Sequence, residues 1–192
     1  MQSLLDYASR RSCQRDQVWF SCSLVYDPPK NMDLSSNEVR IAFDGDAVLF
    51  SDESDQVYRR GGLEAFEQHE TKLENIPLKE GPLKGFLEAL SRIQARFPED
   101  GNANKCPIRT SLVTARALPA HKRPINTLRK WNIRLDESFF LGGVEKARVL
   151  RALKPHIFFD DQSSNLEPSK ADHPVAEVPG DPEVRGGIAY NR

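Results

Sequence analysis

Residues 39–50, VRIAFDGDAVLF, decide how the fold of this chain is interpreted. An apolar run rich in β-branched residues ends at Asp44-Gly45-Asp46 and resumes at Ala47, which is typical of a buried strand that delivers two carboxylates to its carboxyl end. Carboxylates are costly to bury without a partner, so this position indicates a cation or a reaction. Gly45 lets the backbone turn sharply between them. The alternative is an Asp-Gly turn between the two strands of a hairpin.

The composition is that of a single globular domain. The chain has 192 residues, of which 39% are hydrophobic and 29% charged, and its formal net charge is -1. We expect neither a nucleic acid polymer nor a membrane as a partner, because the charge attracts neither and no apolar run approaches the roughly 20 residues of a membrane helix. Cys13, Cys22 and Cys106 lack the spacing of a zinc site or disulfide framework, which favours a reducing compartment. The sequence therefore predicts a soluble, cytoplasmic protein.

Further strands are predicted along the chain, and most of them end at a polar residue or a glycine pair. They cover about residues 108–113 before Thr114, 139–141 before Gly142-Gly143, and 156–159 before Asp160-Asp161, with 175–178 as a candidate fifth strand and Val18–Tyr26 as a candidate N-terminal one. Helices are predicted between the strands by apolar residues at helical spacing. They are short helices interrupted at Gly61-Gly62, a helix from Pro82 to about Phe97, one from Pro124 to Trp131, and one over 144–154.

Strands that alternate with helices predict a mostly parallel sheet covered by helices on both faces. In such sheets, ligands bind outside the carboxyl ends of the strands, where the strand order reverses. The polar residues found at these ends are Asp44, Asp46, Thr114, Asp160 and Asp161. We therefore expect separate segments of the chain to converge on one crevice.

The residue types at this crevice favour phosphoryl chemistry. Carboxylates and a hydroxyl, without a set of His or Cys ligands, favour Mg²⁺ before Zn²⁺, and Mg²⁺ is normally held together with a substrate phosphate. An aspartate can also attack phosphorus directly. Lys146 falls in the first turn of a predicted helix, where the dipole disfavours a cation, so a local anion is expected beside it.

Four segments resemble the four motifs of the haloacid dehalogenase superfamily: FDGDAVLF (43–50), LVTAR (112–116), Lys146 before an apolar helix, and FFDD (158–161). The longer strings RIAFDGDAVLFSDES, GPLKGFLEAL, CPIRTSLVTAR and KPHIFFDDQ are similar to the type I cytosolic 5′-nucleotidases, which hydrolyse nucleoside 5′-monophosphates such as AMP with Mg²⁺. The likeness runs from about Val39 to Gln162. It implies an α/β, Rossmann-like haloacid dehalogenase fold with a small helical cap inserted after the first strand.

The resemblance assigns catalytic roles to four residues. Asp44 would be the nucleophile, and Asp46 would be the general acid and then the general base for the leaving ribose oxygen and the attacking water. Thr114 would bind a phosphoryl oxygen, and Lys146 would pair with both the phosphate and Asp44.

The resemblance also implies the ligands of the Mg²⁺ ion. They are Asp44, the main-chain carbonyl of Asp46, and the pair Asp160-Asp161. Within that pair, Asp161 is the first choice for direct contact with the metal. The positions of these residues at the carboxyl ends of the predicted strands also indicate that they lie close together.

Residues 52–104 lie where this superfamily places a cap over the crevice. The implied organisation is an N-terminal extension over 1–38, a catalytic core over 39–180 that contains this cap, and a loose tail over 181–192. The candidates for contact with the base, sugar or phosphate are Phe50, Phe66, His69 and Arg116. Packing within a helix is the alternative for Phe66 and His69, and a surface salt bridge is the alternative for Arg116.

The resemblance departs from the family pattern at both ends of the chain. The family has a substantial segment before the first strand, whereas 38 residues precede Val39 here, and the C-terminal tail is divergent. The chain is therefore interpreted as a minimal catalytic core or a partial one. A 5′-nucleotidase is the favoured function. The alternatives are a phosphatase of the same superfamily for another small phosphomonoester, and a truncated, non-catalytic nucleotide-binding protein. Assembly into a homo-oligomer is left open.

Overall fold

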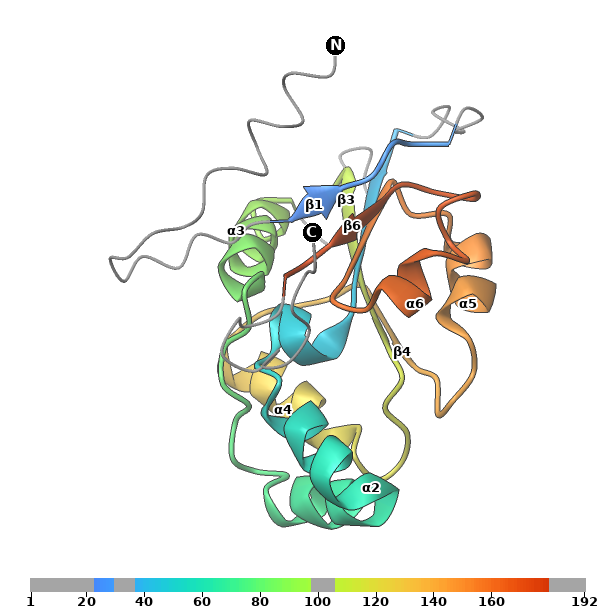
Figure 1. Cartoon of the computed structure of the whole chain (residues 1–192). Coiled ribbons are helices and arrows are strands. Elements are labelled where there is room, and N and C mark those ends of the chain that lie inside the picture. The colour runs from blue at the N-terminus through green and yellow to red at the C-terminus, as the bar shows by residue number, and fades with distance from the viewer. Residues whose placement is uncertain (1–22, 30–36, 98–105, 180–192) are drawn as a thin grey trace, which may run out of the picture.

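The computed structural model describes residues 23–29, 37–97 and 106–179. Within them, six strands form one sheet in the order β1-β6-β5-β2-β3-β4 (Figure 1). β1 pairs antiparallel with β6, and the other neighbouring pairs are parallel. The strands are β1 (Leu24–Val25), β2 (Val39–Phe43), β3 (Ile108–Thr114), β4 (Glu137–Phe140), β5 (Ile157–Asp160) and β6 (Val175–Glu177).

β2 lies near the centre of the sheet, at the point where the strand order reverses. The chain continues from β2 to β3 and β4 on one side and then returns to β5 and β6 on the other. Phe43 on β2 is in register with Leu112 on β3 and with Phe159 on β5. The carboxyl ends of these three strands therefore meet at one edge of the sheet, where the sequence predicts the crevice.

Helices cover both faces of the sheet. α3 (Lys84–Gln94) and α4 (Lys122–Lys130) pack on one face, and α5 (Lys146–Leu153) and α6 (Ser163–Leu166) pack on the other. α2 (Glu53–Lys72) lies beyond the carboxyl ends of the strands, beside α4 (Figure 1). The predicted fold class, a mostly parallel α/β sheet with helices on both faces, is confirmed.

The alternation of side chains along β2 explains its near-continuous apolar sequence. Ile41 and Phe43 belong to the cluster beneath α3 and α4, where the ring of Phe43 stacks on that of Phe159 with centroids 5.4 Å apart. Ala42 belongs to the cluster on the opposite face, with Leu150 of α5. A central parallel strand buried on both faces requires this composition.

The segment after β2 does not form a hairpin. The chain enters a short coiled turn, η1 (Gly45–Leu49), which is closed by a hydrogen bond of 2.9 Å from Phe50 N to Gly45 O. Ala47 adopts a left-handed conformation with φ of 59°. Phe50 then makes an isolated bridge with Glu80. The strand therefore ends before Asp44, and the hairpin alternative is wrong.

The helices match the sequence prediction in kind and differ from it at their ends. α2 is broken at Gly62, whose φ of 71° and ψ of -167° are not helical, as the glycine pair predicts. α3 begins at Lys84, because Pro82 and Leu83 form the turn before it. Its apolar face is only partly covered: Leu87 is inaccessible, whereas Phe86 is 42% exposed. The four-residue α6 has no apolar repeat and was not predicted.

Some predictions concern residues outside the described ranges. The candidate strand Val18–Tyr26 is described from residue 23 onward, where only Leu24–Val25 is extended as β1. The tail 181–192 lies outside the described residues, and the division into extension, core, cap and tail stays a prediction. Among the helices of the described part of the chain, none has both the length and the apolar character needed to cross a membrane.

Candidate active site

Three carboxylates from the ends of β2 and β5 meet in the interior of the protein. Asp44 follows β2, Asp160 is the last residue of β5, and Asp161 follows it. One oxygen of each carboxylate lies within 4.8 Å of an oxygen of the others, and all three residues are buried. We call these three residues the carboxylate cluster. The structure thus brings together three of the four residues predicted to bind a metal.

Lys146 is the first residue of α5, and its ammonium group joins the carboxylate cluster. Its Nζ lies 2.8 Å from Asp44 Oδ2 and 2.7 Å from Asp160 Oδ2, and only 5% of its side chain is exposed. A cation at the start of a helix is disfavoured by the helix dipole, but two carboxylates offset that effect here. The anion expected beside Lys146 is therefore supplied by the protein itself.

The carboxylate of Asp160 is held by several groups of the protein. Its Oδ1 accepts hydrogen bonds from the main-chain N–H of Gln162 at 2.8 Å and from the side-chain amide of Asn165 at 3.1 Å. Its Oδ2 accepts the bond from Lys146. These bonds fix the orientation of the Asp160 carboxylate, and Asp160 in turn fixes the position of Lys146.

Burial and mutual repulsion shift the protonation of the carboxylate cluster. Burial and the charge of Asp160 raise the pKa of Asp44 to about 8, although Lys146 opposes the shift. Burial and the charge of Asp160 also raise the pKa of Asp161 to about 7. Burial lowers the pKa of Lys146, but the charges of Asp44 and Asp160 outweigh it, so that pKa lies above its ordinary value. Asp44 and Asp160 thus share one lysine as their counter-ion, and Asp161 lies beside them.

Thr114, the last residue of β3, lies beside Gly45 at the start of η1. A Cβ atom on Gly45 would lie 3.3 Å from Thr114 Oγ1, so the glycine allows the backbone and the hydroxyl to approach closely. Thr114 Oγ1 accepts a long hydrogen bond of 3.4 Å from Arg116 N. The hydroxyl predicted to bind a phosphoryl oxygen is therefore next to the turn that carries Asp44 and Asp46.

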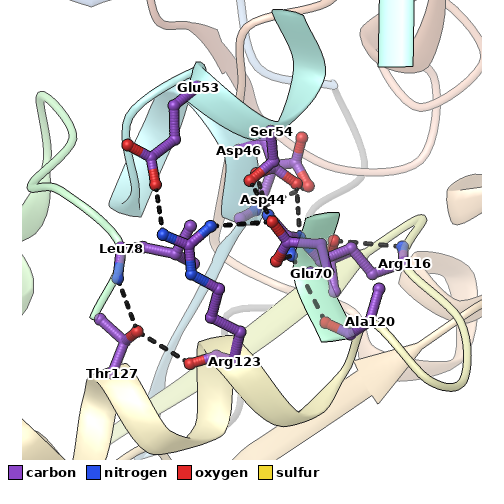
Figure 2. A network of polar contacts seen from close by, with 12 residues as sticks. Asp44, Asp46, Glu53, Ser54, Glu70, Leu78, Arg116, Ala120, Arg123 and Thr127 are labelled. Atoms are coloured by element: carbon purple, nitrogen blue, oxygen red, sulfur yellow. Dashed lines mark hydrogen bonds and ion pairs between the residues drawn. The ribbon is translucent and has the colours of Figure 1, made fainter. Parts of the chain in front are cut away.

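Asp46 is paired with Arg116 and not with the carboxylate cluster. Arg116 Nε and Nη2 donate to Asp46 Oδ2 and Oδ1 at 2.8 and 2.6 Å (Figure 2). The third nitrogen, Nη1, donates to Glu70 and, at 3.4 Å, to the main-chain carbonyl of Ala120. Arg116 is 4% exposed. Its guanidinium is thus engaged in a buried ion pair and not in the surface salt bridge considered from the sequence, and its contact with a substrate stays a prediction.

A second arginine extends this network from α4 (Figure 2). Arg123 Nη1 donates to Glu70 at 2.9 Å, and its Nη2 donates to Glu53 at 2.6 Å. The hydroxyl of Ser54 also donates to Glu70, at 2.8 Å. Burial raises the pKa of Glu70, but Arg116, Ser54 and Arg123 outweigh it, so that pKa lies below its ordinary value. Glu70 is therefore a buried, ionised residue that ties α2 to α4 and to the loop after β3.

Glu70 and Arg123 were missed by the sequence analysis. Charged residues inside helical segments usually face solvent, and neither residue stands in a distinctive motif. Their partners are distant in the chain, since Glu70 is 46 residues from Arg116 and 53 from Arg123. Covariation between these positions is the kind of signal that could reveal such pairs.

The three ring residues predicted to contact the substrate lie in different environments. Phe50 is inaccessible and packs against Trp131, with ring centroids 5.6 Å apart, so the structure places it in the core. Phe66 is 9% exposed, and its ring lies 5.2 Å from the guanidinium carbon of Arg116. His69 retains 30% of its side-chain exposure. Phe66 thus packs within the protein, and His69 is the most accessible of the three.

The carboxylate cluster fits a hard divalent cation. Asp44, Asp160 and Asp161 offer oxygen ligands, which Mg²⁺ prefers, and the cluster contains neither His nor Cys. When its three carboxylates are ionised, their negative charge exceeds the positive charge of Lys146, so a divalent cation would balance it. The main-chain carbonyl of Asp46, the fourth expected ligand, stays a prediction.

Comparisons with known proteins agree with this chemistry. The sequence profile of the 5′-nucleotidase family matches residues 16–183. Human cytosolic 5′-nucleotidase 1B is 45% identical over 152 residues, which are 79% of this chain and 25% of the human protein. The chain thus spans about a quarter of the length of that curated relative. No solved structure gives a significant match. The resemblance to type I cytosolic 5′-nucleotidases is confirmed, and the chain belongs to the 5′-nucleotidase family.

Proposed function

We propose that this chain hydrolyses nucleoside 5′-monophosphates, AMP among them, to a nucleoside and phosphate. The observation that carries the proposal is the buried contact between Asp44 and Lys146 within the carboxylate cluster. Family membership and the name of the human relative support the substrate class, and that name also agrees with the predicted cytoplasmic location. We infer further that the reaction requires Mg²⁺ and proceeds through an aspartyl-phosphate on Asp44.

In the first step, a carboxylate oxygen of Asp44 attacks the phosphorus atom. The bond between Asp44 and phosphorus forms as the bond from phosphorus to the ribose O5′ breaks. Asp46, in its protonated form, gives its proton to O5′, which leaves as the 5′-hydroxyl of the nucleoside. The ammonium of Lys146 and the hydroxyl of Thr114 bind the phosphoryl oxygens, on which charge is spread in the transition state.

In the second step, water hydrolyses the aspartyl-phosphate. Asp46, now ionised, accepts a proton from water while the water oxygen attacks phosphorus. The bond between phosphorus and Asp44 breaks, which restores the carboxylate and releases inorganic phosphate. Asp46 has then regained the proton that it gave to the nucleoside, and the site returns to its initial state.

When bound, Mg²⁺ would supply positive charge that binds the substrate phosphate and stabilises the negative charge on it. We infer that Asp44 and Asp161 are the side chains that hold it. Asp160 is less suited to direct contact, because its two oxygens accept hydrogen bonds from Lys146, Gln162 and Asn165, whereas those of Asp44 pair with Lys146 and the N–H of Gly45. Asp160 would instead keep Lys146 in place.

We propose that the cap over the crevice is α2. This helix lies beyond the carboxyl ends of the strands (Figure 1) and carries His69, the remaining ring candidate for contact with the base or sugar. The later part of the insertion belongs to the core, because Leu87 and Leu90 of α3 pack in the same cluster as Phe43.

A phosphate-release assay tests the proposed function. The substrates are a panel of nucleoside 5′-monophosphates and sugar phosphates, each with Mg²⁺ and with a chelator. We expect phosphate release from the monophosphates with Mg²⁺ and none with the chelator. Asp44→Asn should lower kcat by roughly 10⁴-fold or more while the circular dichroism spectrum is retained. Glu167→Gln is the matched control, because Glu167 is a carboxylate with 65% side-chain exposure that pairs with Lys170 and is not a member of the carboxylate cluster.

The assay also separates the alternatives. Release from sugar phosphates alone would identify a phosphatase for another phosphomonoester. A folded chain that binds monophosphates without releasing phosphate would identify a non-catalytic binding protein. Turnover unchanged by Asp44→Asn would refute the assignment of the nucleophile.

The inferred metal contact has a test of its own that does not need turnover. Mg²⁺ should raise the thermal midpoint of the wild-type chain, because a ligand that binds only the folded state stabilises it. Asp161→Asn should remove most of this increase, and Asp160→Asn should retain more of it. An equal response in both variants would contradict the choice of Asp161.

A further inference from the structure

We propose that Arg116 and Glu70 are positioning residues for Asp46, so that the placement of α2 controls the orientation of the general acid. This inference rests on the proposed function, in which Asp46 transfers the proton. Asp46 follows β2, Arg116 lies in the loop after β3, and Glu70 lies near the end of α2 (Figure 2). Three distant segments of the chain thus meet in one line of contacts.

The first contact in the line is the pairing of Arg116 with Asp46. Two nitrogens of the guanidinium bind the two oxygens of the carboxylate, at 2.8 and 2.6 Å. A bidentate pair of this kind fixes the plane of the carboxylate as well as its position. Asp46 is 21% exposed in its side chain, whereas Arg116 is 2% exposed. The partly open acid is therefore held by a buried partner that cannot turn freely.

The second contact explains why Arg116 keeps its orientation. Its third nitrogen donates to Glu70, whose side chain has no exposed surface. Glu70 is itself fixed, because its other oxygen accepts hydrogen bonds from Ser54 and Arg123. All three nitrogens of Arg116 are thus bound to acceptors of the protein. This arrangement favours a role of Arg116 toward Asp46 over a role toward the substrate.

The position of Glu70 on α2 links the placement of this helix to the orientation of Asp46. α2 lies at the carboxyl ends of the strands. Its Glu70 forms a buried ion pair with Arg116, and removing one partner of such a pair strongly destabilises the folded protein. A shift of α2 would therefore move Arg116 and change the orientation of Asp46. The acid is correctly placed only while α2 is seated.

Two substrates with different leaving groups test this role. A nucleoside leaves from its monophosphate as an alcohol and needs a proton, whereas the nitrophenolate of p-nitrophenyl phosphate leaves without one. Asp46→Asn should therefore lower kcat/KM for AMP by about 10²- to 10⁴-fold and affect that for p-nitrophenyl phosphate far less, because kcat/KM covers the steps up to release of the leaving group and not the later attack of water, which both substrates share. We expect Arg116→Gln and Glu70→Gln to show the same selective loss, about 10- to 100-fold on AMP, with KM nearly unchanged.

A double-mutant cycle shows whether Arg116 acts through Asp46. If it does, the variant Asp46→Asn with Arg116→Gln should be no slower on AMP than Asp46→Asn alone, since the effects of residues that act as a unit are not additive. Arg109→Gln is the control, because Arg109 on β3 pairs with Glu137 on β4, outside the contacts that join Asp46, Arg116 and Glu70. It should leave the ratio of the two substrates unchanged.

Three results would overturn the inference. They are an equal loss on both substrates in Arg116→Gln, additive effects in the double mutant, and a raised KM with kcat unchanged, which would make Arg116 a substrate ligand.

A measurement independent of turnover separates this inference from the proposed function. The ¹³C resonance of the Asp46 carboxyl, assigned by its loss in Asp46→Asn, should shift in Arg116→Gln and Glu70→Gln but not in Arg109→Gln. A shift in a chain that does not hydrolyse AMP would support the positioning and refute the nucleotidase, and an unmoved resonance would refute the positioning.

Discussion

Lys146 Nζ lies 2.8 Å from Asp44 Oδ2, and both side chains are buried, with 5% of the lysine and 6% of the aspartate exposed. The two residues come from the start of α5 and the end of β2. A buried ion pair is held in place by the cost of leaving either charge alone, and not by a large net attraction. Asp160, 2.7 Å from the same ammonium, makes Lys146 the shared counter-ion of two acids.

Replacement of this shared counter-ion should destabilise the fold. Lys146→Met leaves Asp44 and Asp160 buried without their cation, so we expect the free energy of unfolding to fall by about 3–5 kcal/mol. Urea denaturation measures it. Adding Asp160→Asn to Lys146→Met should recover part of the stability, because one buried charge is then removed, but no turnover. Lys79→Met, at an exposed position, is the control and should be close to neutral. A Lys146→Met protein as stable as the control would contradict the counter-ion role.

The space beside Gly45 leads to a second prediction. A Cβ at this position would lie 3.3 Å from Thr114 Oγ1 and 3.4 Å from Thr114 Cβ, so Gly45→Ala must displace the threonine slightly. Small displacements of groups that bind the reacting phosphoryl are costly, and we expect kcat/KM to fall by about 10- to 100-fold. Steady-state phosphate release measures the change.

Gly85 provides the matched glycine for that experiment. It lies in α3, and a Cβ there would meet no heavy atom of the described residues within 4 Å, apart from its chain neighbours and the backbone of its own helix. Gly85→Ala should therefore leave kcat/KM unchanged and raise stability by up to about 1 kcal/mol, because alanine favours a helix. If Gly45→Ala had the kinetics of Gly85→Ala, the close approach of Gly45 to Thr114 would have no role in phosphate binding.

The parts of this structure that were predictable depend on local rules. β2 is apolar on both faces, and a polar residue marks the end of three strands: Asp44 directly after β2, and Thr114 and Asp160 as the last residues of β3 and β5. Parallel strands bring their carboxyl ends together, so the meeting of Asp44 with Asp160 follows from strand order alone. Gly62 breaks α2 for a similarly local reason, since its φ of 71° favours glycine.

The parts that were not predictable depend on contacts between distant segments. Arg116 stands in the second motif and was assigned to substrate or surface, but its partner Asp46 is 70 residues away. Phe50, at the end of the first motif, was a candidate for contact with the base or sugar. The turn η1 instead directs its ring into the core against Trp131. Neither outcome is encoded in the spacing of neighbouring residues.

The contact of Gly81 with the end of η1 predicts an effect on stability. Gly81 N donates to Leu49 O at 2.9 Å, and Leu83 N donates to Val48 O at 2.9 Å, so this segment closes over the turn. A Cβ on Gly81 would collide with the carbonyl oxygen of Phe50 and lie 2.7 Å from the carbonyl carbon of Leu49. Because backbone atoms cannot yield easily, Gly81→Ala should cost about 1–3 kcal/mol in urea denaturation. A denaturation midpoint equal to that of Gly85→Ala would show that the segment is free to move away.

His173 should make the stability of the fold depend on pH. It is 3% exposed, and both of its ring nitrogens are buried without a hydrogen-bond partner among the described residues. Burial lowers the pKa of His173, with a smaller opposing effect of Asp172. The unfolded chain, with a histidine pKa of about 6.5, therefore binds a proton before the folded chain does. Stability should fall as the pH drops below about 6.5 and level off below the folded pKa, with a slope of at most about 1.4 kcal/mol per pH unit.

His173→Leu isolates this contribution from that of the acidic groups. Leucine has no titrating group and fills a similar apolar space, so the variant should lack the loss of stability that begins near pH 6.5. At neutral pH its stability should be equal or slightly higher, because an imidazole without partners is removed from the interior. The measurement is the free energy of unfolding of both proteins between pH 5 and 8, where the gap between the two curves should widen toward pH 5. Parallel curves would mean that His173 is already protonated in the folded protein or accessible to water, and the burial argument would fail.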